Sequence, residues 1–237
     1  MPDVVTKTLP SDPPPPTPGS ACEALEQTPW LSRVPAAMLD NLAQHAVLHR
    51  VPTGSVLFRQ SETPSFALLL MSGCVELVGV EGSVEALVET VLPIDLLLPA
   101  AVLNRQPYLA DGRALEEALL VLIHVDAFRA AVAADHALCL AVLACQAAHF
   151  RRQVKLAKNL KLRSAEDRVG CYLLRLVTAA TPHTSVRLPM EKRRIAWQLG
   201  MTRETFSRTL ATMTRYGLRV SGDIIEISDP AALLTRR

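Results

Sequence analysis

The 237-residue sequence lacks the cysteine patterns of disulfide scaffolds and of cysteine-rich zinc sites. It holds five cysteines, an odd number, and no two of them form a Cys-x-x-Cys pair. Both observations argue against a disulfide framework and against a zinc site built from cysteines. We therefore expect the protein to work in the reducing cytoplasm.

The sequence also lacks the features of membrane, exported and catalytic proteins. It has no run of about 18 uncharged apolar residues, so we expect no membrane span and no membrane partner. The first residues are not followed by a basic segment and an apolar stretch, so we expect no signal peptide. We find no Gly-rich phosphate loop, no Ser or Cys nucleophile motif and no metal-ligand spacing, and therefore do not expect an enzyme.

Negative charge is scarce toward the C-terminus. Residues 151–237 hold 18 Lys/Arg against 7 Asp/Glu, a net charge of +11, whereas residues 1–150 hold 7 against 16, a net charge of −9. This division suggests a polyanionic partner for one end of the chain only. Charge alone does not distinguish nucleic acid from acidic lipid.

Proline and strand patterns organise the N-terminal part. Prolines crowd residues 9–18, where each fixes φ and removes an N–H, so we expect a disordered Pro-rich tail over residues 1–21. We assign residues 22–134 to a sensory domain of compact antiparallel β structure. Runs rich in Val, Leu and Ile, separated by turn residues, predict strands over residues 65–71, 75–80, 84–91 and 114–123.

A long helix is predicted over residues 135–162, capped by Asp135 and free of Gly and Pro. A stripe at coiled-coil spacing consists of Leu140, Leu143, Ala147, Phe150, Val154 and Ala157. A second stripe lies roughly opposite and consists of Leu138, Val142, Cys145 and His149. Two apolar faces predict that one packs on the helix's own domain and the other on a partner subunit, so we expect a homodimer. The alternative is a helix that packs only on its own domain.

Residues 163–237 contain two predicted helices joined by a tight turn. A short amphipathic helix over residues 190–199 ends at Gly200, which tolerates positive φ. Thr202 caps the next helix, predicted over residues 203–216. A helix, a short turn with glycine and a second helix make a helix-turn-helix.

The flanking segments predict the winged form of this motif. Ser164 and Asp167 indicate a capping box at the start of a helix over residues 165–180. Two short strands, residues 218–220 and 224–227, flank a Ser-Gly-Asp turn and predict a β-hairpin, the wing. A further short strand is predicted at residues 185–188.

The second helix has one apolar and one polar face. Its apolar residues, Phe206, Leu210 and Met213, cluster on one side and must face the core. The residues predicted to read bases are Arg203, Glu204, Ser207 and Arg208. Arg pairs bidentately with guanine, and Glu accepts from the cytosine amino group. A merely solvated helix would also be polar here, but the preceding helix, the turn and the basic surroundings favour DNA reading. The residues predicted to contact phosphate are Lys192, Arg193, Arg194, Thr202, Arg215 and Arg219.

This order of parts resembles the CRP/FNR family of bacterial transcription regulators, over about residues 22–230. The strongest match is the segment 195–208, IAxxLGMTRETFSR, which is similar to the family's recognition segment. The resemblance implies an α+β fold: a β-roll like a cyclic-nucleotide-binding domain, a long dimerisation helix and a C-terminal winged helix-turn-helix. The segments 159–163 and 188–192, NLKLR and LPMEK, resemble the FtrB-type branch, which is associated with iron-transport control.

The sequence departs from the family's known ligand sites. Cyclic-nucleotide-binding members carry a Gly-Glu pair and an Arg-Ser or Arg-Thr pair, whereas residues 95–102 and 107–112 have neither, and Arg113 lies past the phosphate-binding position. A buried phosphate without a cation or N–H donors is strongly disfavoured, so we do not expect cyclic AMP as effector. The iron–sulfur branch uses an N-terminal cysteine cluster, but only Cys22 lies there, so we expect no cluster.

Two hypotheses for the effector remain open. Cys145 and His149 lie four residues apart on the stripe away from the predicted dimer seam, where they would ligate haem or a transition metal, or Cys145 would sense oxidation. The alternative is that Cys145 is a small buried hydrophobic residue and His149 a satisfied histidine. The second hypothesis is an apolar small-molecule pocket lined by residues 96–102 and the long helix, with plain β-roll core as its alternative.

Together these features predict a sequence-specific DNA-binding transcription regulator. A homodimer would bind an inverted repeat with half-sites about one helical turn, ~10 bp, apart, and a signal other than cyclic AMP would gate it. The alternative function is a sensory or interaction module that has lost specific DNA binding. The expected partners are double-stranded DNA and a second copy of the chain, with RNA polymerase as a further candidate.

Overall fold

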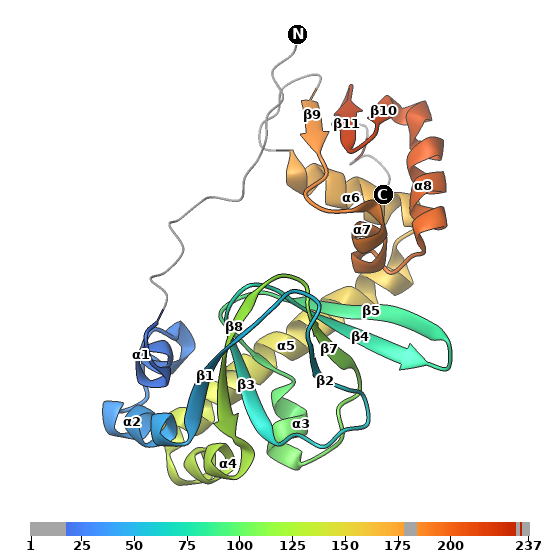
Figure 1. Ribbon diagram of the computed structural model, residues 1–237. Helices are drawn as coiled ribbons and strands as arrows, with labels where there is room; N and C mark the ends of the chain where they lie inside the picture. The colour runs from blue at the N-terminus through green and yellow to red at the C-terminus, as the bar shows by residue number, and fades with distance from the viewer. Residues whose placement is uncertain (1–17, 178–183, 231–232, 234–237) are drawn as a thin grey trace. The chain divides into compact units, whose positions relative to one another are not determined.

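The computed structural model describes residues 18–177, 184–230 and 233, and the chain divides into two compact units, Pro16–Gln153 and Val154–Arg237. Figure 1 shows the elements of both units. The division falls inside the long helix α5 (His136–Leu162), so the segment predicted to be the dimerisation helix contributes to each unit.

The N-terminal unit begins with short helices. Its first helix, α1 (Ala21–Glu26), is capped by the Ser20 side chain, which accepts from the Glu23 N–H. The tail predicted over residues 1–21 therefore extends too far, and its residues 1–17 lie outside the described residues. The helices η1 (Pro29–Leu31) and α2 (Ala36–Gln44) follow.

Two four-stranded antiparallel sheets form the β-roll, which confirms the predicted β domain. One sheet has the order β1-β8-β3-β6 and the other β2-β7-β4-β5. The run predicted as one strand over residues 114–123 is two strands in different sheets, because the chain bends at Leu115 and Glu116. The strands are β1 (Ala46–Val51), β2 (Val56–Phe58), β3 (Phe66–Ser72), β4 (Val75–Glu81), β5 (Val84–Val91), β6 (Asp95–Leu97), β7 (Asp111–Ala114) and β8 (Ala118–His124).

The central strand β3 explains why its sequence is continuously apolar. Leu69 and Met71 belong to the core shared with the helices, whereas Leu68 and Leu70 belong to the core between the two sheets. Successive strand residues point to opposite faces, so a strand covered on both faces needs apolar residues at every position.

Three helices complete this unit: α3 (Pro99–Asn104), α4 (Val125–Ala134) and α5. The sequence did not predict α4. Asp135 ends α4 and caps α5, since its carboxylate accepts from the Leu138 N–H at 2.7 Å. Among the described helices, no single one is long and apolar enough to cross a membrane; α4 and α5 pass that test only as a pair, bent by 113°.

The C-terminal unit contains the predicted winged helix-turn-helix. The capping box of Ser164 and Asp167 is present at the start of α6. β9 pairs with β11, so the predicted hairpin becomes a three-stranded sheet of order β10-β11-β9. The elements are α6 (Ala165–Leu176), β9 (Thr184–Arg187), α7 (Lys192–Gln198), α8 (Arg203–Thr212), η2 (Met213–Tyr216), β10 (Leu218–Ser221) and β11 (Ile224–Ile227).

Two predicted helices differ at their ends. The helix predicted over residues 203–216 is α-helical only to Thr212 and then tightens into the 3-10 helix η2. Near this point the hydroxyls of Thr209, Thr212 and Thr214 bond back to backbone carbonyls, which competes with regular helix geometry. α6 ends at Leu176, and residues 178–180 of its prediction lie outside the described residues.

Candidate functional site

The N-terminal turns of α8 present the four predicted base-reading residues to solvent. Arg203, Glu204, Ser207 and Arg208 are all exposed. The Thr202 hydroxyl caps the helix by accepting from the Thr205 N–H at 3.2 Å. The structure thus brings these side chains together at one helix end.

Buried residues fix the orientation of α8. Phe206, Leu210 and Met213 are at most 2% exposed and belong to the same core as Ile195 of α7 and Ile225 of β11. Gly200, in the turn between α7 and α8, has a φ of +62°, the left-handed conformation expected for a helix-ending glycine. The predicted apolar face of the recognition helix is therefore confirmed.

Glu204 is ionised at neutral pH in this setting. Its own backbone N–H and then the Thr202 side chain bond to the carboxylate and hold its pKa below the ordinary value, with Arg203 and Arg208 acting in the same direction. An ionised carboxylate accepts hydrogen bonds and donates none. The cytosine amino group donates, so its partner must be an acceptor of this kind.

The predicted phosphate-contacting residues occupy several elements. Lys192, Arg193 and Arg194 lie on α7, where Arg193 is exposed and the other two are half-buried. Arg219 is exposed on β10, opposite Glu226 of β11.

Arg215 has partners within its own unit. Its Nη2 donates to both carboxylate oxygens of Glu166, at 2.9 and 3.0 Å, and its guanidinium lies 4.8 Å from the centre of the Tyr216 ring. A phosphate would therefore compete with Glu166 for Arg215, which makes it a weaker candidate than Arg219.

The two predicted stripes of α5 are in different environments. Leu138, Val142 and Cys145 are buried against the β-roll, in one core with Leu96 and Phe128. All residues of the predicted dimer seam are exposed: Leu140, Leu143, Ala147, Phe150, Val154 and Ala157.

A cavity of about 600 Å³ lies in the β-roll unit, between β4, β5, the α3 region and α5. Residues 98–101 and α5 side chains line it, as the apolar-pocket hypothesis expected, and the lining includes Leu98, Gln146, His149 and Phe150. The buried Oε1 of Gln146 has no hydrogen-bond partner among the described residues. The cavity has the size of a site for a small molecule.

The charges around this cavity do not suit a cyclic phosphate. Of the described residues, Glu89 lines the cavity but no Arg or Lys does. Arg113 is held by Glu85 at 2.8 and 3.0 Å and by Asp111 at 3.1 Å. An anionic phosphate would meet a carboxylate and no available cation, which argues against cyclic AMP as the ligand.

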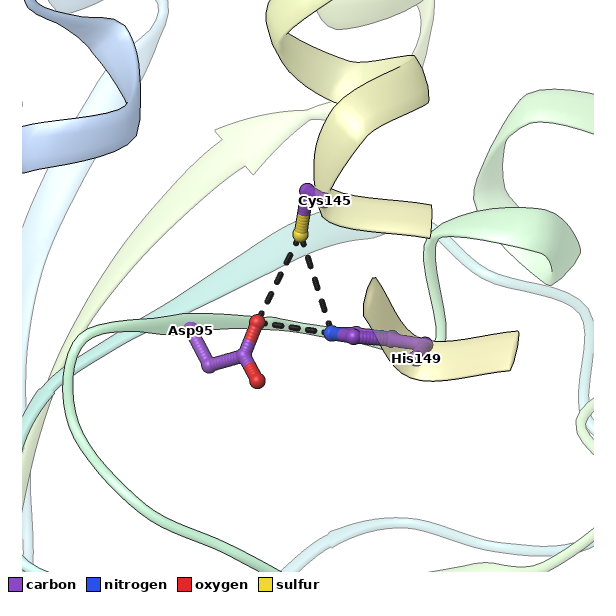
Figure 2. A group of neighbouring side chains, drawn as sticks. All are labelled: Asp95, Cys145 and His149. Atoms are coloured by element: carbon purple, nitrogen blue, oxygen red, sulfur yellow. Dashed lines mark hydrogen bonds and ion pairs between the residues drawn. The ribbon is translucent and has the colours of Figure 1, made fainter. Parts of the chain in front are cut away.

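Cys145 and His149 do share a polar cluster, and Asp95 of β6 completes it (Figure 2). Asp95 Oδ1 lies 2.7 Å from His149 Nε2 and accepts from the Cys145 thiol at 3.4 Å, while the sulfur lies 3.6 Å from the same nitrogen. The Asp95 and His149 side chains are only 16% and 13% exposed.

An ion-pair chain supports this cluster. Arg152 donates to Asp95 Oδ2 at 2.7 Å and to Glu89 at 2.8 Å. Burial opposes ionisation of Asp95, but the hydrogen bond and charge of His149, together with Arg152, outweigh it and lower the pKa of Asp95. Burial, followed by the Asp95 charge, raises the pKa of the Cys145 thiol to about 12.

Sequence reasoning missed Asp95, Glu89 and Arg152. The sequence pattern drew attention to Asp95 only as part of residues 95–102, which lack the residue pairs that bind a cyclic nucleotide. Arg152 follows His149 by three residues, one helical turn, which was an available signal for a shared face. No local pattern links Asp95 to a helix 50 residues away.

Two family models match the chain. A cyclic nucleotide-binding domain model matches residues 48–135, and a Crp-like helix-turn-helix domain model matches residues 167–236. The nitrogen fixation regulation protein FixK of Azorhizobium caulinodans is 33% identical over 115 residues. That match covers 46% of each chain, so it spans less than half the length of this relative.

Solved structures share the fold across both units. A candidate cyclic nucleotide binding protein from Ruegeria pomeroyi is 26% identical, with a TM-score of 0.52, over 90% of this chain and 95% of its own. FixK2 from Bradyrhizobium japonicum is 21% identical, with a TM-score of 0.61, over 80% and 96%. With both domain models in this order and this fold, the chain belongs to the CRP/FNR family of transcription regulators, which are not enzymes.

Proposed function

We propose that this protein is a sequence-specific DNA-binding transcription regulator that acts in the cytoplasm as a homodimer on an inverted-repeat site. The observation that carries the proposal is the exposed polar end of α8. Its polar residues are Arg203, Glu204, Ser207 and Arg208, and the opposite face of the helix is apolar and buried. A rigid helix end with two guanidinium groups and a carboxylate has the donors and acceptors that read base edges in the major groove.

Charge supports the choice of DNA. Residues 151–237 carry a net charge of +11, and cationic side chains on α7 and β10 flank the reading helix. Such side chains bind phosphate without regard to sequence and set the register in which α8 enters the groove.

The exposed stripe of α5 supports the homodimer. Leu140, Leu143, Phe150 and Val154 are between 48% and 65% exposed on one helix at heptad spacing. A parallel pairing of two such helices gives a two-fold assembly with two α8 helices. Its half-sites would lie about one helical turn, ~10 bp, apart.

A ligand of the β-roll unit other than cyclic AMP would gate this dimer. The cavity favours a largely apolar small molecule with a hydrogen-bond donor for Gln146. Two other signals could gate the dimer. One is haem or a metal ion bound by Cys145 and His149, and the other is oxidation of Cys145. The high pKa of Cys145, about 12, weighs against oxidation, since the thiolate is the reactive form.

The test is selection of bound sequences from random duplex DNA, followed by affinity measurement on the selected site. Arg208→Ala should relax specificity at a guanine position and cost about 1–3 kcal/mol on that site. Arg33→Ala, which removes the same charge from an exposed position of the β-roll unit, is the matched control and should leave the preference intact.

Two results would contradict the proposal in different ways. An unchanged preference in Arg208→Ala would mean that α8 presents another face to DNA. Absence of any preferred duplex sequence, with and without candidate ligands, would favour a sensory module that has lost specific DNA binding.

A further inference from the structure

We propose that Asp95, Cys145 and His149 form a binding site for one divalent transition-metal ion, with Zn²⁺ the ion that best suits their donor atoms. The three side chains converge from two elements, β6 and α5, with the sulfur, one ring nitrogen and one carboxylate oxygen facing each other (Figure 2). Nothing in the proposed DNA-binding function requires this convergence.

The donor spacing is close to that of a tetrahedral site. Bonds of about 2.3 Å to sulfur and about 2.0 Å to nitrogen or oxygen, at tetrahedral angles, place the donors roughly 3.3–3.6 Å apart. The sulfur already lies 3.6 Å from His149 Nε2 and 3.4 Å from Asp95 Oδ1. The nitrogen–oxygen pair, at 2.7 Å, is a hydrogen bond that must open by about 0.6 Å.

The donor set selects the class of ion. Thiolate and imidazole are the ligands of zinc and of its transition-metal neighbours, whereas magnesium and calcium require oxygen alone. A single carboxylate oxygen as the third ligand is common in zinc sites.

The surrounding groups hold the ligands in place and balance the charge. Arg152 occupies Asp95 Oδ2 and the Leu96 N–H donates to Oδ1 at 2.9 Å, so the carboxylate is oriented from two sides. A histidine that binds a metal ion is neutral, so in the metal-bound site Asp95, Glu89 and Arg152 together carry one net negative charge. Loss of the Cys145 proton brings it to two, which matches a dication.

We assign the fourth coordination position to the side of His149 that faces the cavity. His149 lines the cavity of about 600 Å³, so water or a small ligand entering there would complete the shell. Three protein ligands and one open position are the arrangement of a zinc site that exchanges a ligand.

A second group of possible ligands, Cys22, Glu26 and Asp40, provides a contrast. Glu26 and Asp40 are exposed and Cys22 is half-buried, with its thiol bonded to Asp40 at 3.2 Å. Exposed carboxylates remain hydrated and are not held in position, so we do not propose this group as a site.

The experiment titrates Co²⁺, a spectroscopic substitute for Zn²⁺, into the full chain after chelator treatment and without DNA. We expect one Co²⁺ per chain with a thiolate-to-metal charge-transfer band, and displacement of the Co²⁺ by Zn²⁺. Cys145→Ser should abolish the band, and His149→Gln and Asp95→Asn should weaken binding by more than about tenfold.

Two other thiols supply matched controls. Cys139→Ser removes an exposed thiol from the same helix, and Cys22→Ser removes the thiol of the contrasting group; both should keep the band and the affinity. A wild-type measurement guards against variants that fail to fold: Zn²⁺ binding at pH 7 should release at least one proton per ion, because Cys145 must lose its own.

Absence of a charge-transfer band at saturating Co²⁺, or its persistence in Cys145→Ser, would overturn the proposal. Since no DNA is present, either result leaves the proposed regulator function untouched.

Discussion

Both faces of α5 carry large apolar side chains, but their surroundings are opposite. Leu138 and Val142, on the face toward the β-roll, are 0% and 1% exposed, whereas Leu143 and Phe150 on the other face are 61% and 65% exposed. The first face stabilises the fold of a single chain. The second remains open to water, where an apolar stripe of this kind marks an interaction surface.

The largest effect is expected from breaking the exposed face. The double substitution Leu143→Glu and Phe150→Glu places charges in the proposed seam, so the protein should become monomeric by sedimentation. Affinity for an inverted repeat should fall by about 10²–10⁴-fold, because two linked reading helices bind far more tightly than one. Val84→Glu, at an equally exposed valine of β5 (66%), is the control, and a persistent dimer in the double variant would place the interface elsewhere.

The buried face should respond in stability instead. Leu138→Ala should lower the free energy of unfolding by about 2–5 kcal/mol, since it leaves a cavity in the core beneath α5. Leu140→Ala, two residues away on the exposed face, should cost less than about 0.5 kcal/mol in the monomeric background. If denaturant unfolding showed that both variants lose the same free energy of unfolding, the two faces of α5 would not differ in burial as described.

The smallest effect is expected at the polar end of the buried face. Asp95→Asn removes the carboxylate partner of His149 and one of the two carboxylate partners of Arg152, which keeps Glu89. The substitution should cost about 1–3 kcal/mol at pH 7 in metal-free protein. Because the pKa of Asp95 is lowered, its contribution is present above about pH 4, the ordinary value, and is lost as the pH falls through the folded-state value.

The stability difference between wild type and Asp95→Asn should therefore shrink on acidification, as thermal melts between pH 7 and pH 3 would record. The exposed Glu81→Gln is the matched control, with no comparable loss at pH 7. A difference that stays constant over this range would show that ionised Asp95 does not stabilise the fold.

The reading helix could be predicted because its signals are local. Thr202 caps the helix, Gly200 ends the one before it, and Phe206 and Leu210 repeat at helical spacing. Elsewhere local signals failed: α4 was overlooked, and β9 was not assigned to the sheet of β11. Strand partners depend on the path of the whole chain, which periodicity does not reveal. The FtrB-type resemblance stays a prediction.

The sequence by itself determined the helical repeat of α5, its two apolar stripes and the polar end of α8, because helix periodicity and capping act within one or two turns. Only the tertiary structure showed what the stripe of Leu138 and Val142 packs against, and only it brought Asp95 to Cys145 and His149. Those contacts depend on how two sheets close and which helix covers them, which residues near in sequence do not specify.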